Sequence, residues 1–275
     1  MGCSAGREAA QSRGTGLESV KKHIETNFNV AQNAIPHILI VLVLSALSWL
    51  AHAAEPVLRV AVLNHSPPMS YTDPAGKLTG FNVEIMHALC EAMNARCEPV
   101  SVTLERVVDA VAAGEFDFAA VSLLATPERR ARVLMTRPYY RSISVWFARP
   151  GVRPGAGRVA LVKGGVQYRY GTAHAWSVIP VENHDGIATA LHQGSADATL
   201  LPMATALALQ QDPRIRGLGL TTAVLRDPEL AGDVCLSVNP RSPELADKLN
   251  EAIDLIKRDG RFDRINSRFI PFRLQ

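Results

Sequence analysis

Between residues 105 and 129, apolar residues first recur at helical spacing and then form an unbroken run. The helical spacing lasts as far as Gly114, and glycine can end a helix in the left-handed conformation without a steric penalty. The apolar run at 117–124 is typical of a strand that is covered on both faces. Thr126 and Pro127 then have the composition of a helix start, with Thr126 as the N-cap. This stretch therefore predicts a helix, a buried strand and a second helix.

Two polar residues stand close to the predicted carboxyl end of that strand. Ser122 lies near the carboxyl end of the strand, and Arg129 follows in the next helix. Open α/β sheets bind ligands at the carboxyl ends of their strands, and a guanidinium can hold a carboxylate through paired hydrogen bonds. The alternatives are a surface arginine and a serine that bonds only to the backbone.

The same order of helix, glycine, aspartate and strand recurs later in the chain. The matching residues are Ala110, Gly114 and Asp117, which recur as Ala190, Gly194 and Asp197. This repeat predicts two similar lobes that face each other, with a ligand between their strand ends. The alternative is one large α/β domain containing two similar units.

Hydrophobic patterns elsewhere predict further strands and helices. We expect strands at 57–63, 98–102, 142–148, 158–162, 196–201 and 234–238, and helices at 81–93, 186–193, 202–211, 243–259 and 262–269. A hairpin-like loop is expected at 71–80, and the turn-rich segment 149–157 is interpreted as the first crossing between lobes. The predicted lobes are 54–152 plus 233–275, and 153–232.

Composition narrows the class of protein. The chain has 275 residues, of which 47% are hydrophobic and 20% charged, as expected for globular domains. A formal net charge of +3 is too small to indicate nucleic-acid binding. The sequence has no phosphate-binding glycine loop, no zinc-like spacing of Cys and His, and no nucleophile–base pair. We therefore expect no metal and no cofactor.

An N-terminal segment carries the signal for cellular location. Residues 38–51 are uncharged and at about 1.5 Å per residue extend roughly 21 Å, less than a bilayer core of about 30 Å. Ala51-His52-Ala53 follows as a small-x-small cleavage site, so residues 1–53 are interpreted as a signal peptide with a preceding extension. The alternative is an uncleaved membrane anchor, and Val20 is a candidate for an alternative start.

Cysteines are consistent with export. On one continuous helix, the Cα atoms of Cys90 and Cys97 would lie about 10.5 Å apart, too far for a disulfide. A turn at Asn94 would end the helix and allow a bridge, whereas the alternative is two buried thiols. Cys235 lies in an apolar run and is expected to be an inert core thiol.

The mature chain as a whole resembles the periplasmic solute-binding proteins of family 3, which serve ABC importers of polar amino acids. The motifs that carry this resemblance lie at 58–61 (LRVA), 67–69 (PPM), 76–84 (GKLTGFNVE), 114–117 (GEFD), 126–129 (TPER), 138–140 (PYY) and 259–262 (DGRF). The second of these stands where the family often has Pro-Pro-Phe, and the third is similar to its GKLTGFDVD-like signature. The resemblance implies a two-lobed type II periplasmic-binding-protein fold in the α/β class, with a mixed sheet flanked by helices in each lobe. Cys90 and Cys97 also stand where basic-amino-acid binders of this family carry a disulfide.

By this resemblance, Arg129 would hold the carboxylate of the ligand, assisted by Ser122 and by backbone amides near Leu124. Several positions depart from the family pattern. Leu124 replaces a usual serine or threonine, Ser66 and Leu104 stand where aromatic residues often stack on the ligand, Gly165-Val166 replaces a threonine-bearing loop, and Pro202 stands where an aspartate usually binds the α-ammonium group. Tyr71, Asn64, His65 and Gln167 are further candidates for the lining, with a purely structural role as the alternative.

The sequence therefore predicts a monomeric periplasmic protein that binds a small anionic or zwitterionic solute, either an amino acid or a related organic acid. We expect it to deliver this solute to the membrane subunits of an ABC importer. The missing aspartate argues against a standard α-amino acid, because a buried ammonium would lack its partner. Two alternatives are a sensing or partner-binding module and a dehydratase-like enzyme, in which His65 and His174 would be the candidate acid and base.

Overall fold

A computed structural model describes residues 57–274 of the chain, and the predicted signal peptide lies outside this range. The strands are β1 (Val57–Leu63), β2 (Tyr71–Thr72), β3 (Leu78–Thr79), β4 (Arg96–Val102), β5 (Phe118–Leu124), β6 (Leu134–Met135), β7 (Tyr140–Ala148), β8 (Arg158–Val162), β9 (Ser177–Val181), β10 (Ala198–Pro202), β11 (Thr221–Val224) and β12 (Ala231–Val238).

Helices connect and cover these strands. They are α2 (Phe81–Ala92), α3 (Leu104–Ala113), α4 (Pro127–Arg130), α5 (Val166–Ala173), α6 (His184–His192), α7 (Met203–Leu209), α8 (Pro213–Arg216), the 3-10 helix η1 (Pro228–Leu230), α9 (Pro243–Arg258) and α10 (Arg261–Phe269). No helix in the described part of the chain is long and apolar enough to span a membrane.

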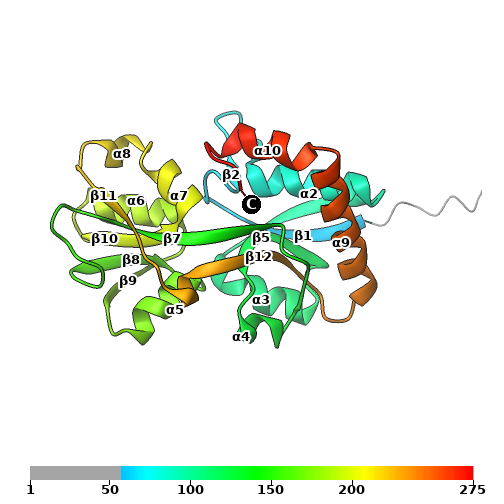
Figure 1. Ribbon diagram of the computed structural model, residues 1–275, viewed down its shortest axis with the longest axis horizontal. Helices are drawn as coiled ribbons and strands as arrows, with labels where there is room; N and C mark the ends of the chain where they lie inside the picture. Colours follow the sequence, from blue (N-terminus) through cyan, green and yellow to red (C-terminus); the bar gives the residue numbers. More distant parts are fainter. Residues whose placement is uncertain (1–56, 275) are drawn as a thin grey trace, which may run out of the picture. The chain divides into compact units, whose positions relative to one another are not determined.

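Most of the described strands form one mixed sheet in the order β4-β1-β5-β12-β7-β10-β8-β9, with β6 paired to β12 and β11 paired to β7, while β2 and β3 form a separate two-stranded sheet. We call the part built on β1, β4, β5 and β12 lobe 1, and the part built on β8, β9 and β10 lobe 2 (Figure 1). Strand β7 belongs to both, because its residues 140–143 pair with β12 and its residues 144–148 pair with β10. The predicted two-lobed α/β architecture is confirmed, while the lobe boundaries predicted at residues 152 and 233 stay a prediction.

Both faces of the lobe 1 sheet are covered. Along β1, Val60 and Val62 join a core with α2, α9 and α10, whereas Ala61 and Leu63 join a second core with α3. Figure 1 shows α2 and α10 on one side of the strands and α3 on the other. Alternate side chains of a strand point to opposite faces, so both must be apolar when helices cover both.

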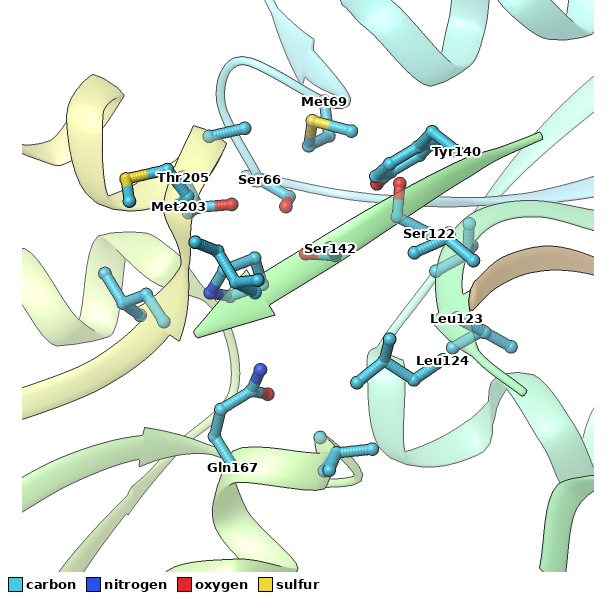
Figure 2. A pocket seen from close by; sticks show the side chains of 18 of the residues that line it. Ser66, Met69, Ser122, Leu123, Leu124, Tyr140, Ser142, Gln167, Met203 and Thr205 are labelled. Atoms are coloured by element: carbon cyan, nitrogen blue, oxygen red, sulfur yellow. The ribbon is translucent and has the colours of Figure 1, made fainter. Parts of the chain in front are cut away.

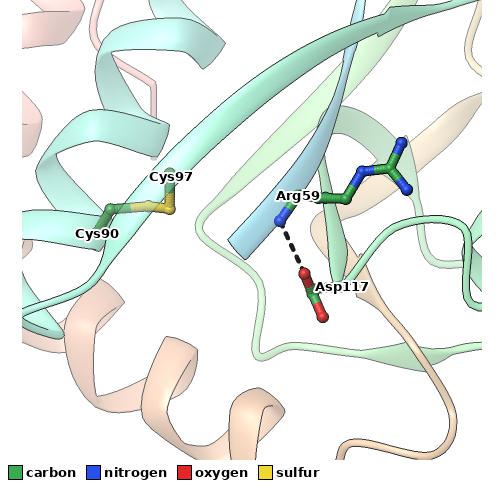
Figure 3. The surroundings of a disulfide bond; sticks show 4 residues. All are labelled: Arg59, Cys90, Cys97 and Asp117. Carbon is green, nitrogen blue, oxygen red and sulfur yellow. Dashed lines mark hydrogen bonds between the residues drawn. A yellow bond between two sulfur atoms is a disulfide. The ribbon is translucent and has the colours of Figure 1, made fainter. Parts of the chain in front are cut away.

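The repeated motif forms the same local structure in each lobe. Gly114 ends α3 with a positive φ of 83°, and Gly194 follows α6 with a φ of 70°. The carboxylate of Asp117 accepts a hydrogen bond of 2.7 Å from the backbone N–H of Arg59 (Figure 3), and Asp197 accepts one of 2.9 Å from the backbone N–H of Arg158. The aspartate therefore fastens the start of one parallel strand to its neighbour in both lobes.

The chain turns sharply between the two predicted cysteine positions and closes the bridge. Asn94 adopts a φ of 51° directly after α2, and β4 then runs back along it. The Cα atoms of Cys90 and Cys97 lie 6.1 Å apart and their sulfurs are bonded (Figure 3). Cys235 is buried, and its burial raises the pKa of the thiol to about 11, so it stays protonated and unreactive.

Candidate binding cavity between the lobes

A cavity of about 490 Å³ lies where strands of the two lobes end. Its walls include residues from the carboxyl ends of β1 and β5 in lobe 1, and of β8 and β10 in lobe 2. Figure 2 shows Ser66 and Met69 from the segment after β1, Met203 and Thr205 from α7, and Gln167 from α5 around the same space. Ligand pockets in α/β proteins occur at this edge of the sheet.

Arg129 reaches this cavity from the short helix α4. The side chain of Thr126 caps the helix by accepting from the backbone N–H of Arg129 at 3.3 Å, and Pro127 supplies the first helical position. This local geometry turns the arginine side chain inward, where only 6% of it is exposed. The alternative of a surface arginine is therefore wrong.

Among the described residues, only backbone carbonyls hold the guanidinium of Arg129. Nη1 donates to the carbonyl of Leu124 at 3.0 Å, and Nη2 donates to the carbonyl of Gly164 at 3.1 Å. None of the ion pairs formed within residues 57–274 involves Arg129. A guanidinium has five N–H donors, so three remain for another acceptor. Burial lowers the pKa of Arg129 to about 10, which still leaves it charged at neutral pH.

Ser122 belongs to a buried network on the lobe 1 side. Its hydroxyl donates to Oδ1 of Asn82 at 3.0 Å, and the hydroxyl of Tyr139 donates to the same oxygen at 3.2 Å. The alternative of a serine bonded only to backbone is therefore wrong. Since Oδ1 of Asn82 is occupied twice, the group that Asn82 can offer to the cavity is its amide NH₂, a donor.

Beside Arg129, α5 of lobe 2 presents its first turn to the cavity. Its N-cap is Gly165, which provides no side-chain cap, so the first backbone N–H groups of the helix lack a side-chain acceptor. Gln167 also lines the cavity, and its Nε2 donates to the hydroxyl of Ser144 at 2.9 Å. Helix N-termini of this kind favour negative charge.

Several contacts join the lobes around the cavity. Arg129 reaches Gly164 as described, Lys163 pairs with Glu105 at 3.1 Å, and Arg169 contacts the carboxylate of Glu128. The backbone at Gly164 lies so close to α3 that an added Cβ would meet Cα of Glu105 at 2.5 Å. The lobes therefore meet directly at the rim beside the buried guanidinium.

Most residues proposed from the sequence do line this cavity. They are Ser66, Leu104, Ser122, Leu124, Arg129, Gly165, Gln167 and Pro202. Tyr71 does not; it borders a separate hollow together with His65 and Pro67. The roles of these residues in ligand binding stay predictions.

Other lining residues were not found from the sequence. Asn82 lines the cavity and stands where the family signature similar to residues 76–84 has aspartate. This difference from the signature could have identified Asn82 as a lining residue. His184 lines the cavity although the residue lies in no motif, and its Nδ1 is buried without a hydrogen-bond partner. Burial lowers the pKa of His184 to about 4, so the ring is neutral at physiological pH. Its position depends on the fold alone.

Acidic side chains do not contribute to the cavity wall. Among residues 57–274, the lining contains no aspartate and no glutamate. No group of three or more His, Cys, Asp or Glu in the same part of the chain has a metal-binding arrangement. Charge in the cavity is therefore carried by arginine.

Comparison with known proteins agrees with this architecture. The model of the bacterial extracellular solute-binding proteins, family 3, matches residues 58–272. An L-arginine-binding protein of Pseudomonas aeruginosa is 27% identical over 84% of this chain and 94% of its own length.

Solved structures show the same fold. An ancestral arginine-binding protein bound to arginine superposes with a TM-score of 0.71 and 21% identity, covering 78% of this chain and 98% of its own. An ancestral amino-acid-binding protein described as a precursor of cyclohexadienyl dehydratase has a TM-score of 0.67 and 20% identity, covering 78% and 95%.

Proposed function

Because the chain belongs to the bacterial extracellular solute-binding proteins of family 3, we propose that it binds a small carboxylate-bearing solute between its lobes. The solute is then delivered to the membrane subunits of an ABC importer. The observation that carries the proposal is the buried guanidinium of Arg129, which lines the cavity and has carbonyl partners but no carboxylate within the described residues. A buried charge without a counter-charge is costly, and an anionic ligand would supply the missing partner.

Lobe closure is the proposed mechanism of capture. Nη2 of Arg129 in lobe 1 bonds to the carbonyl of Gly164 in lobe 2, so the group that would bind the ligand also touches the opposite lobe. Ligand binding and closure would therefore stabilise each other, as in hinge closure around a solute.

The proposed place of action is the periplasm. The Cys90–Cys97 disulfide supports export, because such bridges persist in oxidising compartments. Export would require the segment 1–53, with cleavage after Ala53. Mass spectrometry of the protein recovered from the periplasm should give Ala54 as the first residue, and recovery from the cytoplasm alone would contradict this location.

We propose binding without catalysis. His65 and His174, the acid and base candidates, do not line the cavity: His65 borders the separate hollow, and His174 is exposed and stacked on Tyr170. His184 does line it, but a pKa of about 4 is poorly matched to proton transfer near neutral pH. Incubation with the substrates of a cyclohexadienyl dehydratase should therefore leave them unchanged, and their dehydration would contradict the proposal.

A thermal-shift screen tests the binding function. The exported protein would be melted with small carboxylates, the matching amino acids and the matching amines. A ligand that binds only the folded state raises Tm according to its concentration relative to Kd. We expect carboxylate-bearing compounds to raise Tm and amines to leave it unchanged. If no carboxylate stabilises the protein, the proposed function is wrong.

A further inference from the structure

We propose that the solute is a monocarboxylate whose remaining body is uncharged and mainly apolar, with no ammonium group. This inference rests on the proposed function and defines the chemical class that the same cavity accepts. It would set this chain apart from relatives whose names state that they bind arginine or amino acids.

Several groups that line the cavity are hydrogen-bond donors. Arg129 has three N–H groups that are free to donate, and Asn82 can donate through its amide NH₂. The first turn of α5, which begins at Val166 and has no side-chain cap, adds backbone N–H donors. A carboxylate has two oxygens that accept and none that donate, so it matches this set of groups. These donors therefore account for the single negative charge of the proposed ligand.

A positive group on the ligand would have no charged partner. Within residues 57–274, no aspartate or glutamate lines the cavity, whereas Arg141 and Arg273 line it in addition to Arg129. These two arginines are paired with Asp233 and Asp263, which stand outside the lining. An ammonium in the cavity would be desolvated near positive charge, with neutral groups instead of carboxylates as its acceptors.

Two positions in the lining could have offered an acceptor to an ammonium group of the ligand, but neither does. Pro202, at the end of β10, has neither a side-chain acceptor nor a backbone N–H, and it lies in the wall next to the buried Leu201. Asn82 could offer an oxygen, but that oxygen already accepts from Ser122 and Tyr139. Neither of these two positions therefore offers an acceptor that would be suited to an α-ammonium group.

Apolar side chains make up much of the remaining wall, and the cavity is large enough for a hydrocarbon body. These side chains include Met69 from lobe 1, and Leu200, Met203 and Leu207 from lobe 2. A volume of about 490 Å³ falls within the range of about 300–1,000 Å³ found for small-molecule pockets. Branched-chain and aryl-substituted carboxylates combine one anionic end with a body of this kind.

Matched compounds test the inference. Isothermal titration of the exported protein would compare 3-phenylpropanoate with L-phenylalanine and 2-phenylethylamine, and 4-methylpentanoate with L-leucine and 3-methylbutylamine. We expect the acid to bind at least about tenfold more tightly than its amino acid in each series, because the unpartnered ammonium costs free energy. A smaller ratio, or tighter binding of the amino acid, would overturn the inference while leaving the proposed function intact. Absence of binding by every acid and amino acid would overturn both.

A substitution at the lost acceptor position provides a second test. P202D would place a carboxylate in the wall, where it would also be a good N-cap for α7. We expect this variant to lower the ratio of acid affinity to amino-acid affinity by about tenfold or more. P202A removes the proline without adding charge and should keep the wild-type ratio. If P202D and P202A give the same ratio, the missing counter-charge does not determine the ligand class.

Discussion

Replacing Arg129 by methionine separates its role in binding from its role in stability. R129M keeps a long flexible side chain in the cavity wall but removes the charge and all of the donors. A carboxylate ligand would then be buried without a partner, and losing one member of a buried charge pair costs about 2–5 kcal/mol. We therefore expect affinity to fall by roughly 30-fold to 4,000-fold.

The ligand-free protein should change much less. A pKa of about 10 instead of 12.5 means that burial costs the charged side chain about 3 kcal/mol. The two hydrogen bonds to the carbonyls of Leu124 and Gly164 return about 1.5 kcal/mol each, since a charged donor makes them stronger than average. The two effects nearly cancel, so the Tm of the free protein should stay within roughly 6 °C of the wild type.

Titration calorimetry and thermal melting measure these two effects. The probe would be 3-phenylpropanoate or 4-methylpentanoate, whichever binds the wild type more tightly. R130M is the matched control, because Arg130 is the next residue of α4, is exposed and does not line the cavity. The reasoning is refuted if R129M binds within threefold of the wild type, or if R130M loses as much affinity as R129M.

Three further predictions concern closure, pH and the disulfide. G164A should weaken ligand binding about tenfold or more, because its Cβ would meet the backbone of α3 at 2.5 Å. G151A is the control: Gly151 has a similar φ with open space around it, so this variant should bind normally in the same titration. The pKa of His184 is about 4 in the folded protein and 6.5 in the unfolded chain, so the unfolded chain takes up a proton first as the pH falls. The free energy of unfolding should therefore fall by up to about 3 kcal/mol from pH 6.5 to 4. Melting curves of H184Q should lack this part of the pH dependence. Removing the bridge with C90A/C97A should cost about 2.5 kcal/mol for so short a loop, seen as a Tm roughly 5–10 °C lower, and an unchanged Tm would contradict this.

Local patterns predicted much of lobe 1 and the position of its key residues. The stretch from α3 to α4 has strong periodicity and clear caps, and the structure places Arg129 and Ser122 beside the strand end as expected. The resemblance in addition predicted the bridge between Cys90 and Cys97, which is present.

Lobe 2 was harder to predict, for physical reasons. Strand β9 is an edge strand that contains Pro180, and every residue of β11 is exposed, so neither has the apolar alternation of a half-buried strand. Helix α5 has polar and aromatic residues without a clear apolar stripe. His184 reaches the cavity through tertiary contacts, and local sequence has no information about such contacts.

Asp117 and Asp197 hold the strands of their lobes together at a distance from the cavity that we propose for the solute. Asp117 and Asp197 grip the amino-terminal side of the parallel strands, while the cavity opens at the far, carboxyl side of the same strands. Substitutions at the cavity side, such as proline at position 202, leave the hydrogen bonds of the two aspartates at the amino-terminal side of the strands intact. A protein built in this way can change its solute through successive substitutions while every intermediate sequence still folds.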